Sequence, residues 1–152
     1  MLNEMGSYLE TNLLADLGVD EYPTSLPIKQ VVQGEDVQIS TYPAIKLMEG
    51  AVRPTRTEFG TGDPTQGVDR IYEWILHGSV INTTRNGARA DAETLVKRCE
   101  AWIETTYGLG GLSDGHEACD ASEPGAWYVS AKGSGNLWMG MWRIPIYIHT
   151  VT

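Results

Sequence analysis

Residues 114–120 concentrate side chains that can bind metals or transfer protons. Within Asp114-Gly115-His116-Glu117-Ala118-Cys119-Asp120, four neighbouring residues are His, Glu, Cys and Asp. Zinc sites use these side chains at characteristic spacings, usually as two ligand pairs. This segment matches no such spacing, and no second cluster completes a coordination shell. We therefore interpret it as a solvated acidic loop and expect no metal.

Other arrangements that could support catalysis are incomplete. The glycine-rich run from Gly108 to Gly111 follows a predicted helix, whereas phosphate-binding loops open a helix and continue into Lys-Ser/Thr. His77 and His149 fall on predicted strands beside apolar residues, where a hydrogen-bonded structural histidine is common. Gly111-Leu112-Ser113-Asp114-Gly115 has the letters of a Gly-x-Ser-x-Gly motif, but it follows a predicted helix instead of joining a strand to a helix, so it is not a nucleophile elbow. We expect neither an enzyme nor a bound cofactor.

The stretch from Arg70 to Tyr107 predicts the central unit of the fold, a long strand followed by a helix. Alternation along residues 71–81 predicts a strand with two different faces. One face is apolar and consists of Tyr72, Trp74, Leu76 and Val80. The other is mixed and consists of Ile71, Glu73, Ile75, His77, Ser79 and Ile81. This second face is too polar for the core of a monomer but apolar enough to be partly covered.

A helix is predicted after the turn-like segment 82–87. Its apolar stripe contains Leu95, Cys99, Trp102 and Ile103 at helical spacing. Asp91 is the predicted N-cap, and Gly108 is the predicted stop.

The N-terminal third predicts a second helix and the first main strand. Leucines and methionines at steps of three and four predict an amphipathic helix over residues 2–17, ending near Gly18. Residues 20–34 hold two prolines and predict an irregular connection. Residues 42–49 predict a strand, with Pro43 at its start or on an edge because proline has no N–H donor.

Two long loops and two more strands complete the chain. The loop 50–69 contains Arg53, Arg56 and Glu58, which are either a contact surface or a solvated hairpin tip. A second loop covers 108–125, and strands are predicted over 126–131 and 137–150. In the last strand Arg143 and Tyr147 lie on the less apolar face, and Pro145 indicates an edge or a bulge. An exposed edge strand requires a cover, such as a neighbouring subunit.

The predicted class is α+β in a single domain spanning residues 1–152. The order helix-strand-strand-helix-strand-strand indicates one largely antiparallel sheet with two helices packed on it.

The formal net charge of −9 disfavours broad binding to nucleic-acid phosphates. No apolar run approaches the ~20 residues of a membrane span, and the start Met1-Leu2-Asn3-Glu4-Met5 lacks a basic signal region. Two cysteines do not form a disulfide framework, so we expect folding in a reducing cytoplasm.

This order and pattern resemble the tail terminator (tail-completion) proteins of long-tailed bacteriophages. The resemblance rests on residues 42–47 (Tyr-Pro-Ala-Ile-Lys-Leu), the strand 74–81, the helix 92–103 with Asp91 at its head, and the closing segment 142–148. It covers nearly the whole chain and is one of topology and hydrophobic pattern. The segments 20–36 and 108–125 depart from it.

The resemblance implies a virion structural protein, assembled in the host cytoplasm, that forms a ring, usually a hexamer. Such a ring caps the finished tail tube, stops its polymerisation and meets the head connector or stopper protein, while DNA passes through its lumen without specific binding. The expected interface residues are Arg53, Arg56, Glu58, Glu73, His77, Arg143 and Tyr147. Another neck or tail subunit of the same fold, such as a head-closure or tube protein, and a small ligand-binding domain are the alternatives.

Overall fold

The computed structural model describes residues 2–19, 26–55, 69–105, 116–121, 127–132 and 136–150. In chain order its elements are α1 (Leu2–Leu17), β1 (Gln30–Gln33), β2 (Ala44–Thr55), β3 (Asp69–Asn82), α2 (Arg85–Thr105), β4 (His116–Ala121), β5 (Trp127–Lys132) and β6 (Leu137–Thr150). This content confirms the α+β class.

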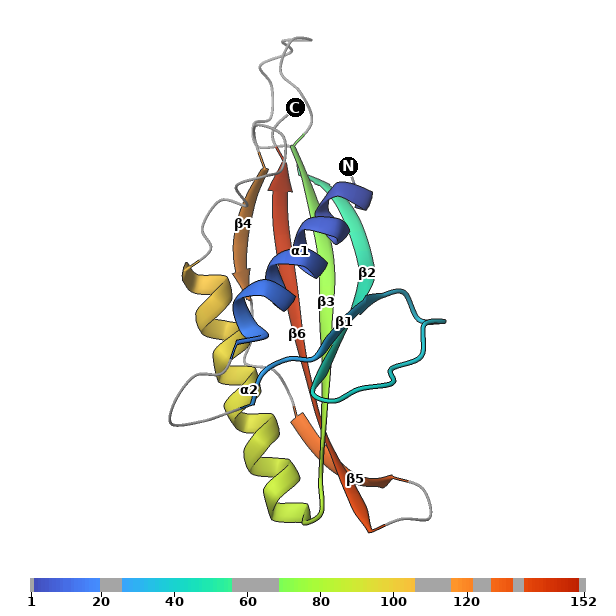
Figure 1. The fold of residues 1–152 in the computed structure, drawn as a ribbon. Coiled ribbons are helices and arrows are strands. Elements are labelled where there is room, and N and C mark those ends of the chain that lie inside the picture. Colours follow the sequence, from blue (N-terminus) through green and yellow to red (C-terminus); the bar gives the residue numbers. More distant parts are fainter. Residues whose placement is uncertain are drawn as a thin grey trace, which may run out of the picture.

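The strands form a six-stranded sheet in the order β1-β2-β3-β6-β4, and β5 also pairs with β6. The pair β1 and β2 is parallel, and the other pairs are antiparallel. The two longest strands, β3 and β6, pair from Arg70 with Thr150 to Asn82 with Trp138 and run through the middle of the sheet (Figure 1). They are the frame on which the remaining elements are placed.

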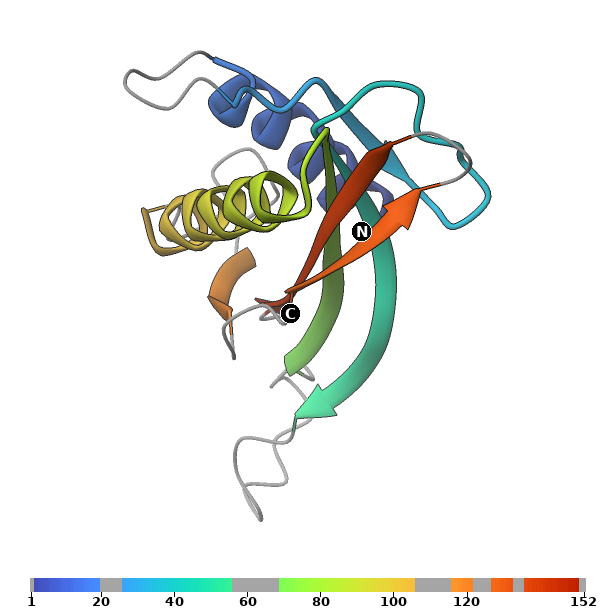
Figure 2. The same cartoon turned by 90° about the horizontal axis from the view of Figure 1, so that it is seen from below.

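Both helices cover the same face of the sheet, and its opposite face carries neither of them (Figure 2). Side chains of α1 and α2 share one buried cluster with alternate residues of β2, β3 and β6. These three strands contribute Ile45, Leu47, Tyr72, Trp74, Leu76, Val80, Trp142, Ile144, Ile146 and Ile148 to it, and β1 contributes Val31. The alternation expected for residues 72–80 is therefore confirmed, because the apolar face packs under the helices.

Polar contacts also join α1 to α2. Trp102 Nε1 donates a 2.7 Å hydrogen bond to Asp16 Oδ2. Arg98 Nη1 donates another hydrogen bond of 2.7 Å to the carbonyl of Leu26, in the segment that leads from α1 to β1.

The helix expected over residues 2–17 is confirmed at both ends.

The order expected from the sequence is wrong at two strands. β1 lies in the segment expected to be irregular, and β4 lies in the expected loop 108–125. β1 has only four residues, Gln-Val-Val-Gln, and is held by parallel pairing to β2. The sequence of β4, His-Glu-Ala-Cys-Asp-Ala, is polar and has no strand pattern, but it pairs with the end of β6. Both strands thus depend on long-range pairing rather than on their own sequence.

The expectation that the last strand is an exposed edge is also wrong. β6 has β3 on one side and both β4 and β5 on the other. On that second side, β4 pairs as far as Ile146 and β5 begins at Trp142, so Pro145 falls in the interval between them. Proline is tolerated in an interior strand where the ladder is interrupted.

Helix α2 begins earlier than expected. Its first residue is Arg85, and Gly87 N donates a 3.0 Å hydrogen bond to Thr84 Oγ1, so Thr84 and not Asp91 is the N-cap. Asp91 lies inside the helix, where its Oδ2 accepts a 2.9 Å hydrogen bond from Asn82 Nδ2. The predicted stop at Gly108 lies outside the described residues.

Candidate interaction surface

The face of the sheet opposite the helices, here called the open face, brings together four of the expected interface residues. Antiparallel pairing places His77 of β3 beside Arg143 of β6, and Glu73 beside Tyr147. Paired residues of neighbouring strands project from the same face of a sheet. The register therefore places these four residues on one surface.

Lys46 of β2 completes a row across three strands. It pairs with His77, which in turn pairs with Arg143. We call Lys46, His77 and Arg143 the cationic row. Arg143 is exposed, while Lys46 and His77 are half-buried among their neighbours.

Apolar side chains surround the cationic row. Met48, Ile75 and Pro145 form the next row of paired residues along the strands. On the other side of the cationic row, Met141 is paired with Ser79 and Met139 with Ile81. All of these except the buried Ser79 are half-buried. The open face therefore combines a largely apolar surface with a line of positive charge.

The charge on His77 is set by its position in the row. Burial is the main cause that lowers its pKa from the ordinary value of 6.5, and the positive charges of Lys46 and Arg143 lower it further. His77 is consequently neutral at pH 7, and the fixed charges of the row are those of Lys46 and Arg143.

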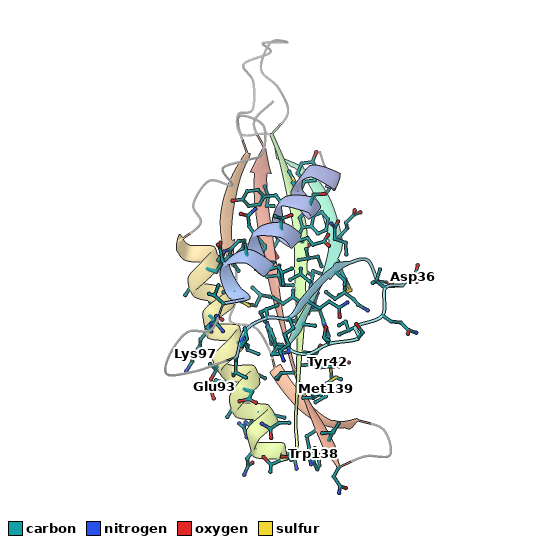
Figure 3. All side chains as sticks on the ribbon, viewed as in Figure 1. Asp36, Tyr42, Glu93, Lys97, Trp138 and Met139 are labelled. Carbon is teal, nitrogen blue, oxygen red and sulfur yellow. The ribbon has the colours of Figure 1, made fainter. Side chains whose placement is uncertain are left out.

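An acidic surface lies at the β1–β2 margin of the sheet. We call Glu35, Asp36 and Glu49 the acidic edge; all three are exposed. Asp36 projects from the outer tip of the loop that follows β1 (Figure 3). A cavity of about 330 Å³ opens here, lined by Gln33, Gly34, Glu35, Leu47, Met48, Glu49 and Trp74. The acidic edge thus has a hollow with apolar and carboxylate walls.

A second cavity of about 420 Å³ lies at the start of β2 and the end of β3, lined by Leu26, Pro27, Lys29, Tyr42, Pro43, Val80 and Ile81. Its lining contains one cation and no carboxylate or histidine. Lys29 and Tyr42 supply the polar side chains of this lining.

Metal ligands and the thiol of Cys99 are the other groups of chemical interest among the described residues. Among them, no group of three or more His, Cys, Asp or Glu side chains could hold a metal ion. Burial raises the pKa of the Cys99 thiol to about 12, although contact with Trp142 and the charge of Arg98 oppose that shift. Cys99 is thus a protonated core residue at neutral pH. Neither described helix is long and apolar enough to cross a membrane.

The remaining expected site residues are placed as follows. Arg53 belongs to β2 and pairs with Ile71 of β3. The expected loop over 50–69 is therefore wrong for its first six positions, which are in β2, and for Asp69, which begins β3. Arg56 and Glu58 lie outside the described residues, as do the side chains of the segment 116–121. Lys46 is a site residue that was not expected from the sequence. Its place could be found only from the β2–β3 register, because the sequence does not give the alignment of two strands joined by a long loop.

A scan against protein-family models finds no match for this chain, and a search of curated proteins finds none either.

Proposed function

We propose that this chain is the subunit of a ring at the head-proximal end of a phage tail tube, where it stops tube polymerisation and joins the tail to the head. Its partners are further copies of itself, the tail tube protein and a head connector or stopper protein. The chain acts structurally, without a cofactor.

The observation that carries this proposal is the open face. A two-layer fold with helices on one side only leaves Ile75, Met141 and Tyr147 without a helix above them, although they lie at the centre of the sheet. Monomeric proteins rarely expose a large contiguous apolar patch, and such patches mark interaction sites. A neighbouring subunit in a ring covers this surface.

The charge of the chain fits a ring through which DNA passes. With a formal net charge of −9, the surface as a whole repels phosphates, so DNA is not retained by counterion release. The cationic row is the exception, and in the ring it is buried in the contact between subunits and does not face the lumen.

The test combines the open-face variant Ile75→Glu with the matched control Leu14→Glu. Leu14 is 41% exposed on α1, outside the open face, so both variants replace an apolar side chain by one negative charge. We expect wild type and Leu14→Glu to form rings that bind the ends of purified tail tubes, and Ile75→Glu to remain monomeric with an unchanged circular dichroism spectrum.

Two results would separate the alternatives. Rings that fail to bind tube ends would indicate a different neck or tail subunit. A wild-type monomer that also leaves tube ends free to polymerise would overturn the proposal.

A further inference from the structure

We propose that the cationic row of one copy of this chain docks on the acidic edge of a second copy, so that copies associate head to tail. This inference rests on the proposed function in that it specifies which two surfaces meet in the ring. It names one occupant for the open face, a second copy of the same chain.

Charge complementarity is the first argument. Among the described residues, neither Lys46 nor Arg143 forms an ion pair, and the carboxylates of the acidic edge form none either. Lys46 Nζ approaches the backbone carbonyl of Glu35 at 3.3 Å and not its carboxylate. Each surface therefore holds charge of one sign that a partner can neutralise, and such complementarity fixes the register of an interface.

The positions of the two surfaces are the second argument. Lys46 of the cationic row lies beside Glu35 of its own chain. Arg143 lies two strands further across the sheet, on β6, whereas Glu35 and Asp36 lie beyond the end of β1 at the margin of the sheet. A contact between two different surfaces of identical chains is heterologous, and it produces a closed ring when the rotation between copies permits closure. A face-to-face dimer would instead bring the cationic rows of both copies to one interface.

The shape of the acidic edge is the third argument. The cavity beside Glu35 and Glu49 has apolar walls from Leu47, Met48 and Trp74. A long cationic side chain can bury its methylene stem along apolar walls while its charged group meets carboxylates. Arg143, the exposed member of the row, is the side chain that we assign to this cavity. Arginine is also enriched among residues that dominate binding energy at interfaces.

Reciprocal charge reversal tests the inference. The face variant is Lys46→Glu/Arg143→Glu, and the edge variant is Glu35→Lys/Glu49→Lys. In a head-to-tail contact, each variant alone places like charges together, so we expect self-association to weaken by roughly tenfold or more. An equimolar mixture presents only complementary contacts, because copies of the two variants can alternate. The mixture should therefore regain wild-type association in sedimentation velocity.

The control variants are Glu93→Lys and Lys97→Glu, which reverse charges of the same signs at an exposed ion pair on α2. We expect each to associate as wild type does. Thermal unfolding of all the variants checks that the folded state is retained.

Three results would overturn the inference. One is wild-type association of both charge-reversed variants, and a second is an equimolar mixture that stays dissociated. The third is wild-type association of the edge variant alone, which would show that the acidic edge takes no part in the contact. Rings that cap tails but ignore the reversals would contradict this inference alone. Oligomers that obey the reversals but leave tube ends uncapped would contradict the proposed function alone.

Discussion

Gly78 of β3 and Trp142 of β6 are paired residues, and the indole of Trp142 lies where a side chain on Gly78 would be. A Cβ added to Gly78 would overlap the six-membered ring of Trp142. Trp142 itself is fully buried in the core beneath the helices. The central strand pair therefore requires glycine at one position so that the largest side chain can occupy the neighbouring one.

Gly78→Ala should destabilise the fold by about 1–3 kcal/mol, because inserting atoms into a packed core forces neighbouring side chains from their preferred rotamers. The free energy of unfolding in urea measures this. Ser79→Ala is the matched control, since the buried Ser79 hydroxyl has no hydrogen-bond partner among the described residues and its loss should cost little. Equal effects of the two substitutions would contradict the packing argument.

Thr84→Ala should destabilise the protein by about 1 kcal/mol, since it removes the side-chain oxygen that accepts the hydrogen bond from Gly87 N at the start of α2. Thr84→Ser keeps this oxygen and should retain most of the stability. Urea unfolding of the three proteins gives the comparison. A Thr84→Ser protein as unstable as Thr84→Ala would show that the cap is not the cause.

The start of α2 illustrates what the sequence could not predict. Residues 82–87 contain turn-forming types, and Asp91 is a good N-cap residue, so local rules place the start of the helix too late. In the structure, Asn82 Oδ1 accepts a hydrogen bond from Thr84 N and Asn82 Nδ2 donates one to Asp91. These contacts allow the chain to enter the helix directly from β3. The helix 2–17 was predictable because its apolar period is long and ends at Gly18.

The open face was partly predictable for a similar reason. Alternation along β3 and β6 distinguishes His77 and Arg143 from the core residues that precede and follow them in each strand. The pleat fixes the side of the sheet to which each residue points. Strand order is set by long-range pairing. Local patterns therefore do not predict that β4 covers part of the far side of β6, or that Lys46 lies beside His77.

Asp16→Ala should destabilise the protein by about 1 kcal/mol, because it removes the carboxylate that accepts the Trp102 Nε1 hydrogen bond and joins α1 to α2. Asp16→Asn keeps an oxygen acceptor and should cost less. Thr11→Ala, at an exposed position of the same helix, should change stability by no more than about 0.5 kcal/mol. Thermal and urea unfolding of the three variants test whether this link between the helices is specific.

His77 should make the protein less stable as the pH falls. Burial, with Lys46 and Arg143 on either side, holds its pKa below 6.5 in the folded protein. The unfolded chain therefore takes up the proton first, and the stability contributed by the neutral imidazole is present above pH 6.5. This contribution is lost as the pH falls from 6.5 through the lowered folded pKa.

The variant His77→Gln isolates this effect, because glutamine is polar but does not titrate. Urea midpoints measured from about pH 8 to pH 5 should fall more steeply for wild type than for His77→Gln over the lower half of the range. Carboxylates titrate in both proteins, so the difference between the two curves reports on His77. Parallel curves would show that the folded state does not hold the imidazole neutral.

The central claim is that the open face is a contact between subunits of a ring. Its most direct test is the mass of the wild-type protein in solution, measured by light scattering over a concentration series and followed by negative-stain imaging of the same sample. We predict a discrete species several times the 16.7 kDa chain mass, about six times for the hexamer that the resemblance implies, with a central hole in the images. A monomer at every concentration, with purified tail tubes present or absent, would contradict the account.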